Sequence, residues 1–184
     1  MKHAPLRTIL AVTIAIQLLN LTACDDPQAP GGPAGGLAET QYLFDVYHVN
    51  HAWGYTLSGF YLDSAGNAYS YDHSHETWTP GNQDSLTAAE LAEKYSHVTE
   101  LMTTVEDRQL RRMNRLIGIA ARDGLTDPQQ EACDMGILHY IGYRHDQTTD
   151  TYHPVVLGET GDWTRYNESE AAGQLRDWLD DLRN

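Results

Sequence analysis

Aromatic and aliphatic residues dominate the stretch from Tyr42 to Tyr71, and one polar cluster, 63–67, interrupts it. Short runs rich in Tyr, Phe and Leu on both sides of such a cluster predict two strands joined as a hairpin, with Gly66 supplying the positive φ of the turn. Residues 42–49 predict an earlier strand, so the simplest arrangement is an antiparallel meander of three strands. The stretch 72–85 predicts a loop.

Helical signals follow this meander. Thr87 and Glu90 fit a capping box, so a first helix should begin there and run to about Tyr95. Apolar residues at spacings of three to five then predict a longer helix that includes Leu101 and ends near Gly124.

The last third of the chain predicts a second hairpin and a closing helix. Residues 136–143 and 154–158 are apolar or aromatic and flank a polar stretch, which is typical of two strands with a longer loop. Asn167 can cap the final helix, whose apolar face is formed by Ala171, Leu175, Trp178, Leu179 and Leu182. Runs of strands separated by helices favour an α+β fold: an antiparallel sheet, with the three-strand meander and the later hairpin, packed against two or three helices.

The N-terminus has the features of an export signal. Lys2 and Arg7 precede an apolar run over 9–19, which is too short to span a bilayer as a lasting helix. The residues that follow, Leu21-Thr22-Ala23-Cys24, resemble the lipobox of bacterial lipoproteins. The resemblance covers only about the first 24 residues, and it implies cleavage before Cys24 and attachment of a lipid to that thiol. An ordinary secretory signal peptide with a chance cysteine is the alternative.

This resemblance divides the chain into three parts. Residues 1–23 would be the signal peptide, and 24–36, rich in Pro and Gly, would be the lipidated N-terminus with a flexible linker. Residues 37–184 would be a single globular domain, large enough to bury a core. Asp25 resembles the signal that retains lipoproteins on the periplasmic side of the inner membrane. The expected location is therefore the cell envelope, outside the cytoplasm.

Charge and cysteine content exclude some classes of partner. Lys2 and Arg7 leave with the signal peptide, so the formal net charge of −14 becomes −16. Such a chain repels phosphate backbones and anionic headgroups, so no nucleic acid partner is expected and the membrane link is the lipid on Cys24. Once Cys24 is lipidated only Cys133 remains, and no internal disulfide is expected.

Histidines suggest a metal site. The sequence holds nine of them, and in Asp72-His73-Ser74-His75-Glu76 an extended backbone would place His73 and His75 on one side, with Glu76 adding an oxygen. Two imidazoles and a carboxylate are a legitimate zinc set, although a third imidazole such as that of His48 or His51 would have to come through folding. Solvated loop histidines explain the same pattern.

Three other groups of residues invite a functional interpretation. Cys133 with His139 could be a nucleophile and base, but a single cysteine is more often a small apolar core residue. Aromatic residues could line a groove for a sugar or peptide, or pack in the core: Trp53, Tyr55, Trp78 and Trp163. Half of the basic residues that follow Cys24 lie in one helical stretch and could bind an acidic partner or pair with nearby carboxylates: Arg108, Arg111, Arg112, Arg115 and Arg122.

The leading hypothesis is a non-enzymatic, lipid-anchored extracytoplasmic binding or interaction domain, because the sequence contains no P-loop, dinucleotide fingerprint, nucleophile elbow or metalloprotease helix. Its protein or small-molecule partner is not identified by any motif. The alternative is a metal-binding protein or metal-dependent hydrolase that uses zinc on His73 and His75.

Replacing Cys24 by Ala tests the resemblance to lipoproteins. The variant should incorporate no radiolabelled fatty acid, because the thiol that receives the lipid is gone, whereas the unmodified chain should be labelled in the same cells. Equal labelling of both chains would contradict the lipobox interpretation.

Overall fold

Along the described chain, single helices alternate with groups of strands or, between α1 and α2, with one strand. The computed structural model describes residues 42–74 and 76–184, so the predicted signal peptide, Cys24, the linker, the start of the domain at residue 37 and His75 lie outside the described residues. The strands are β1 (Tyr42–Asn50), β2 (Thr56–Asp63), β3 (Asn67–Asp72), β4 (Leu86–Thr87), β5 (Val98–Thr104), β6 (Gln129–Gln130), β7 (Ile137–Asp146), β8 (Thr151–Gly161) and β9 (Trp163–Tyr166). The helices are α1 (Ala88–Lys94), α2 (Asp107–Ala120) and α3 (Glu170–Arg183).

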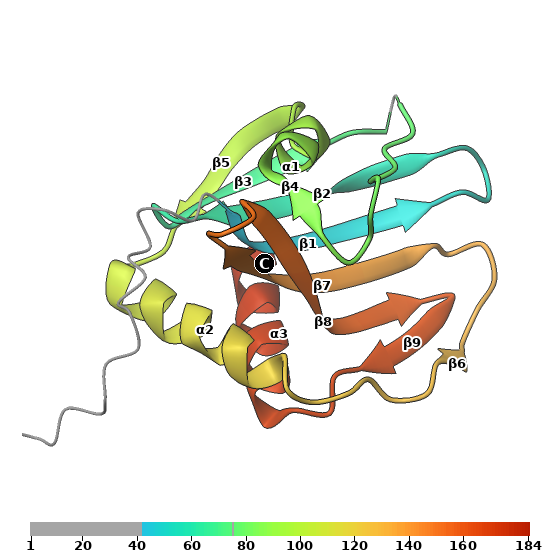
Figure 1. Ribbon diagram of the computed structural model, residues 1–184. Helices are drawn as coiled ribbons and strands as arrows, with labels where there is room; N and C mark the ends of the chain where they lie inside the picture. Colours follow the sequence, from blue (N-terminus) through green and yellow to red (C-terminus); the bar gives the residue numbers. More distant parts are fainter. Residues whose placement is uncertain (1–41, 75) are drawn as a thin grey trace, which may run out of the picture. The chain divides into compact units, whose positions relative to one another are not determined.

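These strands pair antiparallel into a sheet with the order β5-β3-β2-β1-β7-β8-β9-β6, and β4 pairs with β8 (Figure 1). The predicted meander β1-β2-β3 and the predicted later hairpin β7-β8 are both present, and β1 pairs with β7 to join them. The expected α+β fold, an antiparallel sheet packed against helices, is confirmed.

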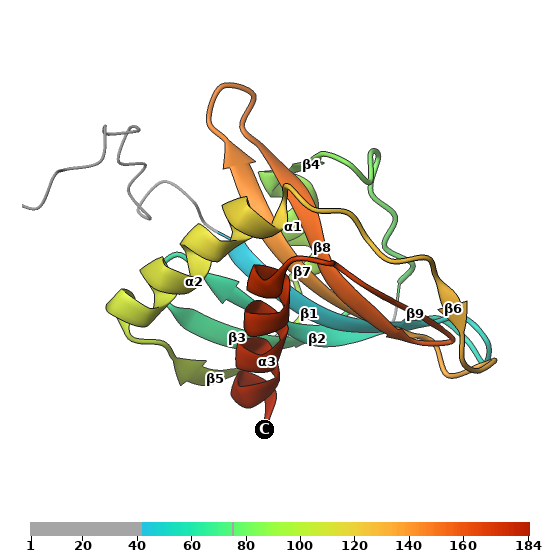
Figure 2. The same cartoon turned by 90° about the horizontal axis from the view of Figure 1, so that it is seen from below.

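Helices cover both faces of this sheet. α2 and α3 lie on one face, and α1 with the loop 73–85 lies on the other (Figures 1 and 2). Side chains alternate between faces along a strand, so in β1 Phe44 and Val46 face α3 and α2, whereas Asp45 and Tyr47 face α1. The sheet therefore separates two distinct cores.

The core under α2 and α3 is mainly aliphatic, with a few aromatic rings of which Trp178 is the largest. α2 contributes Leu110, Met113, Ile117 and Ala120, and α3 contributes Ala172, Leu175, Trp178 and Leu179. The Trp178 ring lies edge-on to Phe44 of β1, with 5.2 Å between ring centroids. This confirms that the predicted apolar face of the last helix packs on the sheet.

Local signals read from the sequence set two of the element boundaries. Gly66 has a φ of +87° in the β2-β3 turn, and a Cβ there would meet the Val105 carbonyl oxygen at 2.6 Å. α1 begins with the predicted capping box, in which the Thr87 hydroxyl accepts from the Glu90 N–H and the Glu90 carboxylate accepts from the Thr87 N–H. Both predictions are confirmed.

Two predicted boundaries are wrong. Residues 98–104 form strand β5, in which Leu101 pairs with Tyr69, so the helix predicted to include Leu101 begins only at Asp107; it ends at Ala120, before Gly124. The spacing of apolar residues did not reveal that the chain first completes the sheet, where β-branched residues such as Val98 and Thr103 are favoured.

The second error concerns the cap of the last helix. Ser169, not Asn167, is the N-cap of α3, and its hydroxyl accepts from the Ala171 N–H. Asn167 is buried one step earlier, where its amide donates to the carbonyl groups of Ala120 and Val156 and its oxygen accepts from the Ser169 N–H. Asn167 therefore ties α2, β8 and the start of α3 together. Among the described residues, no helix is long and apolar enough to cross a membrane.

Trp178→Ala should lower the free energy of unfolding by roughly 3–5 kcal/mol, because it empties a large volume between α3 and β1 that the sheet cannot collapse to fill. Urea unfolding of the full chain, followed by circular dichroism, measures this loss. Trp163→Ala is the matched control: the Trp163 side chain is 42% exposed, so its loss should be below about 1 kcal/mol. Equal effects of the two substitutions would contradict the packing of α3.

Candidate functional site

A cavity of about 500 Å³ opens on the face of the sheet that carries α1. Its walls come from β1, β2, β7 and β8, from α1 and from the loop 73–85. Slightly more than half of the lining residues are aliphatic or aromatic, including Leu57, Ile141 and Val156, and the others are polar or charged. Small-molecule sites in proteins have this size and composition.

The floor of this cavity is built on a buried ion pair. Asp45 of β1 is fully buried and accepts a hydrogen bond from Lys94 Nζ of α1 at 2.6 Å. α1 delivers Lys94 because Leu91 and Lys94 are three residues apart and share the buried side of the helix. The capping box at Thr87 fixes where this short helix begins, and so places both side chains against the sheet.

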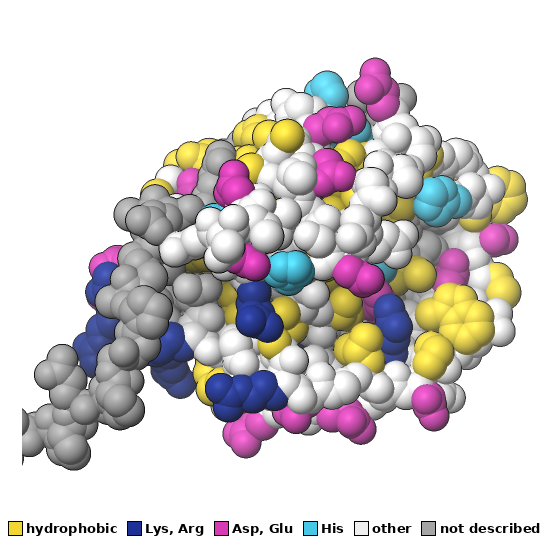
Figure 3. Space-filling model, viewed as in Figure 1, with side chains coloured by type: hydrophobic (Ala, Val, Ile, Leu, Met, Phe, Trp, Pro, Cys, Tyr) yellow, Lys and Arg dark blue, Asp and Glu magenta, His cyan; other side chains and the backbone are white. Residues whose placement is uncertain are grey.

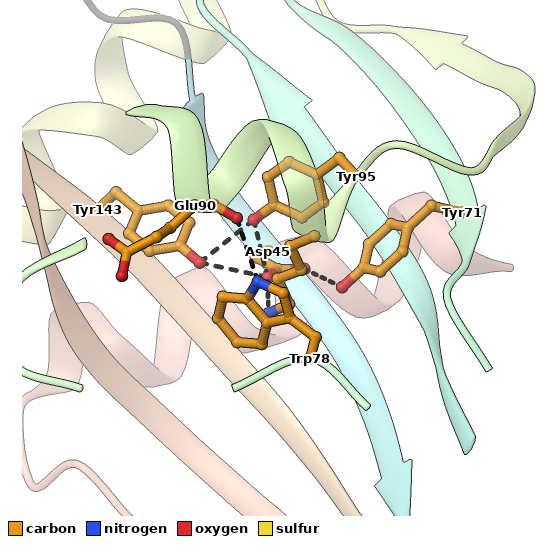
Figure 4. A network of polar contacts seen from close by, with 7 residues as sticks. Asp45, Tyr71, Trp78, Glu90, Tyr95 and Tyr143 are labelled. Atoms are coloured by element: carbon orange, nitrogen blue, oxygen red, sulfur yellow. Dashed lines mark hydrogen bonds and ion pairs between the residues drawn. The ribbon is translucent and has the colours of Figure 1, made fainter. Parts of the chain in front are cut away.

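Three tyrosine hydroxyl groups complete the shell of Asp45 (Figure 4). Tyr95 and Tyr143 donate to the same carboxylate oxygen as Lys94, at 2.9 and 3.2 Å, and Tyr71 donates to the other oxygen at 3.0 Å. These donors come from the C-terminal end of α1, from β7 and from β3. The Asp45 carboxylate therefore connects these three elements to its own strand, β1. Four donors satisfy a charge that burial would otherwise make very unfavourable.

Burial shifts the titration of these groups. Burial lowers the pKa of Lys94, and the Asp45 charge opposes this shift. Burial and the Asp45 charge both raise the pKa values of Tyr71, Tyr95 and Tyr143 well above 10.0, so the three hydroxyl groups remain protonated donors. The cluster is therefore arranged to hold one negative charge on Asp45.

Aromatic rings surround the Lys94 ammonium on the cavity side. Its nitrogen lies 3.4 Å from the centroid of the Tyr47 ring and 4.9 Å from that of Trp78, within the range of cation–π attraction. The Trp78 indole is held in place because its N–H donates to the Glu90 carbonyl oxygen at 3.2 Å (Figure 4). The backbone N–H of Trp78 also donates to the Tyr55 hydroxyl. The loop 73–85 is thereby attached to α1 and to the cavity wall.

A second polar group lies on the same cavity lining. Glu159 of β8 accepts from Arg165 of β9 through two hydrogen bonds, and it pairs with His139 Nδ1 of β7 at 3.0 Å. Burial acts to raise the pKa of Glu159, but hydrogen bonds from His139 and Arg165 outweigh it and lower the pKa to about 2. The stabilisation from this group is therefore present above the ordinary value of 4.5 and is lost as the pH falls toward 2.

The two polar groups meet at one aromatic ring. Tyr47 stacks on the His139 ring with 4.6 Å between centroids, while the Lys94 ammonium lies against the same tyrosine. Burial and the nearby Asp45 and Glu159 charges raise the pKa of Tyr47 far above its usual value. Tyr47 thus remains neutral between a cation and an imidazole.

The aromatic residues predicted to bind a ligand divide into two sets. Tyr55 and Trp78 line the cavity, whereas Trp53, which is 88% exposed, and Trp163 lie outside its lining. The structure therefore brings together half of the predicted set and leaves the other two rings on separate surfaces.

Two of the predicted zinc ligands, His73 and Glu76, are not part of the cavity lining. His73 is buried, and its Nδ1 has no hydrogen-bond partner among the described residues; its ring lies 5.3 Å from that of His97. Glu76 is exposed, and His75 lies outside the described residues. Within residues 42–74 and 76–184, no group of three His, Cys, Asp or Glu side chains is placed to hold a metal ion. A zinc site at His73, His75 and Glu76 stays a prediction.

Cys133 does not occupy the position expected of a core cysteine. It is exposed, so the view of it as an apolar core residue is wrong, and its sulfur accepts from the Gln130 amide at 3.6 Å. His139, considered as its base, is instead engaged with Glu159.

The residues that build the cavity floor were not found from the sequence. The sequence does mark Asp45 as unusual, because it is a lone charge within the apolar run Tyr-Leu-Phe-Asp-Val-Tyr. It also marks Lys94, because this residue lies three positions after Leu91 and so on the same side of a helix. Neither signal names its partner, because Asp45 and Lys94 are far apart in the chain and meet only when α1 packs on the sheet. Comparison with known proteins adds no relative: no family model, curated protein or solved structure matches the chain.

Lys94→Met and Asp45→Asn should both destabilise the fold, since each leaves a buried partner uncompensated, typically at about 3–5 kcal/mol. Asp45→Asn should be the more severe, because in Lys94→Met the carboxylate keeps its three tyrosine donors, whereas in Asp45→Asn the ammonium loses its only counter-charge in the cluster. Urea unfolding of both variants measures the difference.

The double variant is the control for this prediction. Combined, the two substitutions should cost less than the sum of the single losses, because neither charge is then left alone. Additive losses, or a smaller loss for Asp45→Asn than for Lys94→Met, would contradict the proposed role of the pair.

Proposed function

We propose that this protein is a lipid-anchored, extracytoplasmic binding protein that takes up a small molecule in the cavity on the α1 face of the sheet. The observation that carries the proposal is the cavity itself, with about 500 Å³ of space between aromatic and aliphatic walls and a small number of fixed polar groups. The lipid anchor is inferred from the resemblance of residues 21–24 to a lipobox, which lies outside the described residues.

The charges of the lining indicate a neutral ligand. Lys94 pairs with Asp45 and Arg165 pairs with Glu159, so both cations are already neutralised, and the remaining carboxylate of the lining, Asp84, is exposed. A charged molecule would therefore find no buried, unpaired opposite charge among the described residues of the cavity. A neutral molecule loses little hydration on entry, so neutrality favours its binding.

The shape and hydrogen-bonding groups narrow the class further. The indole of Trp78 and the ring of Tyr55 offer flat surfaces, which suit a planar or ring-shaped ligand. The Lys94 ammonium is buried against Asp45 and Tyr47, so hydrogen bonds to ligand oxygens would come from other polar side chains of the lining, Thr77, Thr79 and Gln83. The best-fitting ligand is a neutral ring compound with hydroxyl or carbonyl oxygens.

Binding without chemistry fits the state of the charged groups. Glu159, with its pKa near 2, is a poor proton acceptor at neutral pH, and the tyrosine hydroxyl groups of the Asp45 cluster do not ionise there. Each charged group at the floor already has a fixed partner. These features favour a rigid, preorganised binding site.

A neutral fluorescent probe tests the proposal. N-phenyl-1-naphthylamine, a planar apolar dye, should bind the full chain with a Kd below roughly 50 µM and gain fluorescence as it leaves water. Trp78→Ala should weaken this binding at least about tenfold, because the indole forms one wall of the cavity. Sugars and aromatic alcohols that compete with the dye would then identify the ligand class.

Trp53→Ala is the matched control, since it removes the same side chain from a site outside the cavity lining and should leave the affinity unchanged. Thermal unfolding of each variant verifies that the fold is retained. Absence of dye binding, or equal losses in the two tryptophan variants, would refute a ligand site in this cavity.

A further inference from the structure

Arginines form one continuous face of α2. Arg108, Arg111, Arg112 and Arg115 follow the spacing i, i+3, i+4, i+7, which places them within about 100° of one another around a helix and along about 10 Å of its length. The buried residues of the same helix lie on its opposite side: Leu110, Met113, Ile117 and Ala120. We call the four arginines, with Ile119, the arginine face.

This face is exposed and largely unpaired. All four arginines are exposed, and Arg111 pairs with Asp107 on its own helix. Among the described residues, Arg108, Arg112 and Arg115 make no ion pair. Ile119, four residues after Arg115, is 46% exposed on the same side. Figure 3 shows Lys and Arg side chains gathered over α2.

Such a gathering of cations contrasts with the rest of the molecule. The chain has a formal net charge of −14, and half of the basic residues beyond Cys24 are in α2 or just after it. At physiological salt, charges act over only about 8–10 Å. A surface that touches α2 therefore senses the arginines rather than the net charge of the chain.

We propose that the arginine face lies on an anionic phospholipid surface. Guanidinium groups bind phosphate through paired hydrogen bonds, and an apolar side chain among them suits the boundary between headgroups and acyl chains, where Ile119 would lie. A basic face with an apolar residue is the composition of helices that lie flat on membranes. An acidic protein surface would not provide the boundary between headgroups and acyl chains that suits Ile119.

The topology fits such an orientation. The described chain begins at Tyr42, which pairs with Asp63 next to the β2-β3 turn, and the Val105 N–H donates to Gly66 of that turn just before α2 begins. The chain therefore enters the fold at the end of the sheet where α2 starts. The affinity of the arginine face for anionic lipid requires neither the lipid expected on Cys24 nor a ligand in the cavity.

Vesicle co-sedimentation of the full chain tests the proposal. Binding should be stronger to vesicles of equal parts phosphatidylglycerol and phosphatidylcholine than to phosphatidylcholine alone, and salt should remove the difference. Arg112→Gln/Arg115→Gln should weaken the binding to anionic vesicles roughly 30-fold, since each basic residue near the surface contributes about fivefold.

Arg144→Gln/Arg183→Gln is the matched control, because it changes the net charge equally but lies on β7 and at the end of α3. This control variant should bind the vesicles as the unmodified chain does. All the proteins compared have the same N-terminus, so a difference between them cannot come from the N-terminus. Three outcomes would each overturn the proposal: equal losses in the two double variants, no preference for anionic vesicles, or binding that salt leaves unchanged. This holds even if the arginine face were then found to bind an acidic protein.

Discussion

The buried ion pair between Asp45 and Lys94 is the constraint on which the α1 side of the molecule depends. A carboxylate at the centre of a sheet is tolerated only when donors surround it, and here those donors come from α1, β3 and β7. The requirement that the buried Asp45 carboxylate receive these hydrogen bonds therefore fixes how α1 lies on the sheet. Because Trp78 is bonded to the carbonyl group of Glu90 in α1, the same interaction also positions the loop that closes one wall of the cavity.

The two faces of the sheet are stabilised by different chemistry, and this difference separates structural from functional surface. The face under α2 and α3 is filled mainly by aliphatic side chains, Phe44, Phe60 and Trp178, and its buried Asn167 is used to join α2, β8 and the start of α3. The α1 face is rich in tyrosines, whose hydroxyl groups let a charged pair be buried beside open space. The cavity lies on this second face, where the buried polar groups are held in place by their partners.

The proposals for the cavity and for α2 assign separate tasks to opposite sides of the sheet. A ligand would enter on the α1 face, while the arginine face, on the other side of the sheet, would rest against anionic lipid. A protein held in this way keeps its cavity open to its surroundings.

The sequence by itself determined the fold class and most of the secondary structure, because those depend on local patterns: the aromatic and aliphatic run of β1, the Gly66 turn, the capping box at Thr87 and the apolar stripe of α3. It failed at 98–104, where pairing with β3 outweighed helical spacing, and at Asn167, whose amide serves three elements rather than one cap. Only the tertiary structure decided the site. Asp45 with Lys94, and Glu159 with His139 and Arg165, meet through strand order and helix packing, and no local pattern encodes which distant residues will share a buried charge.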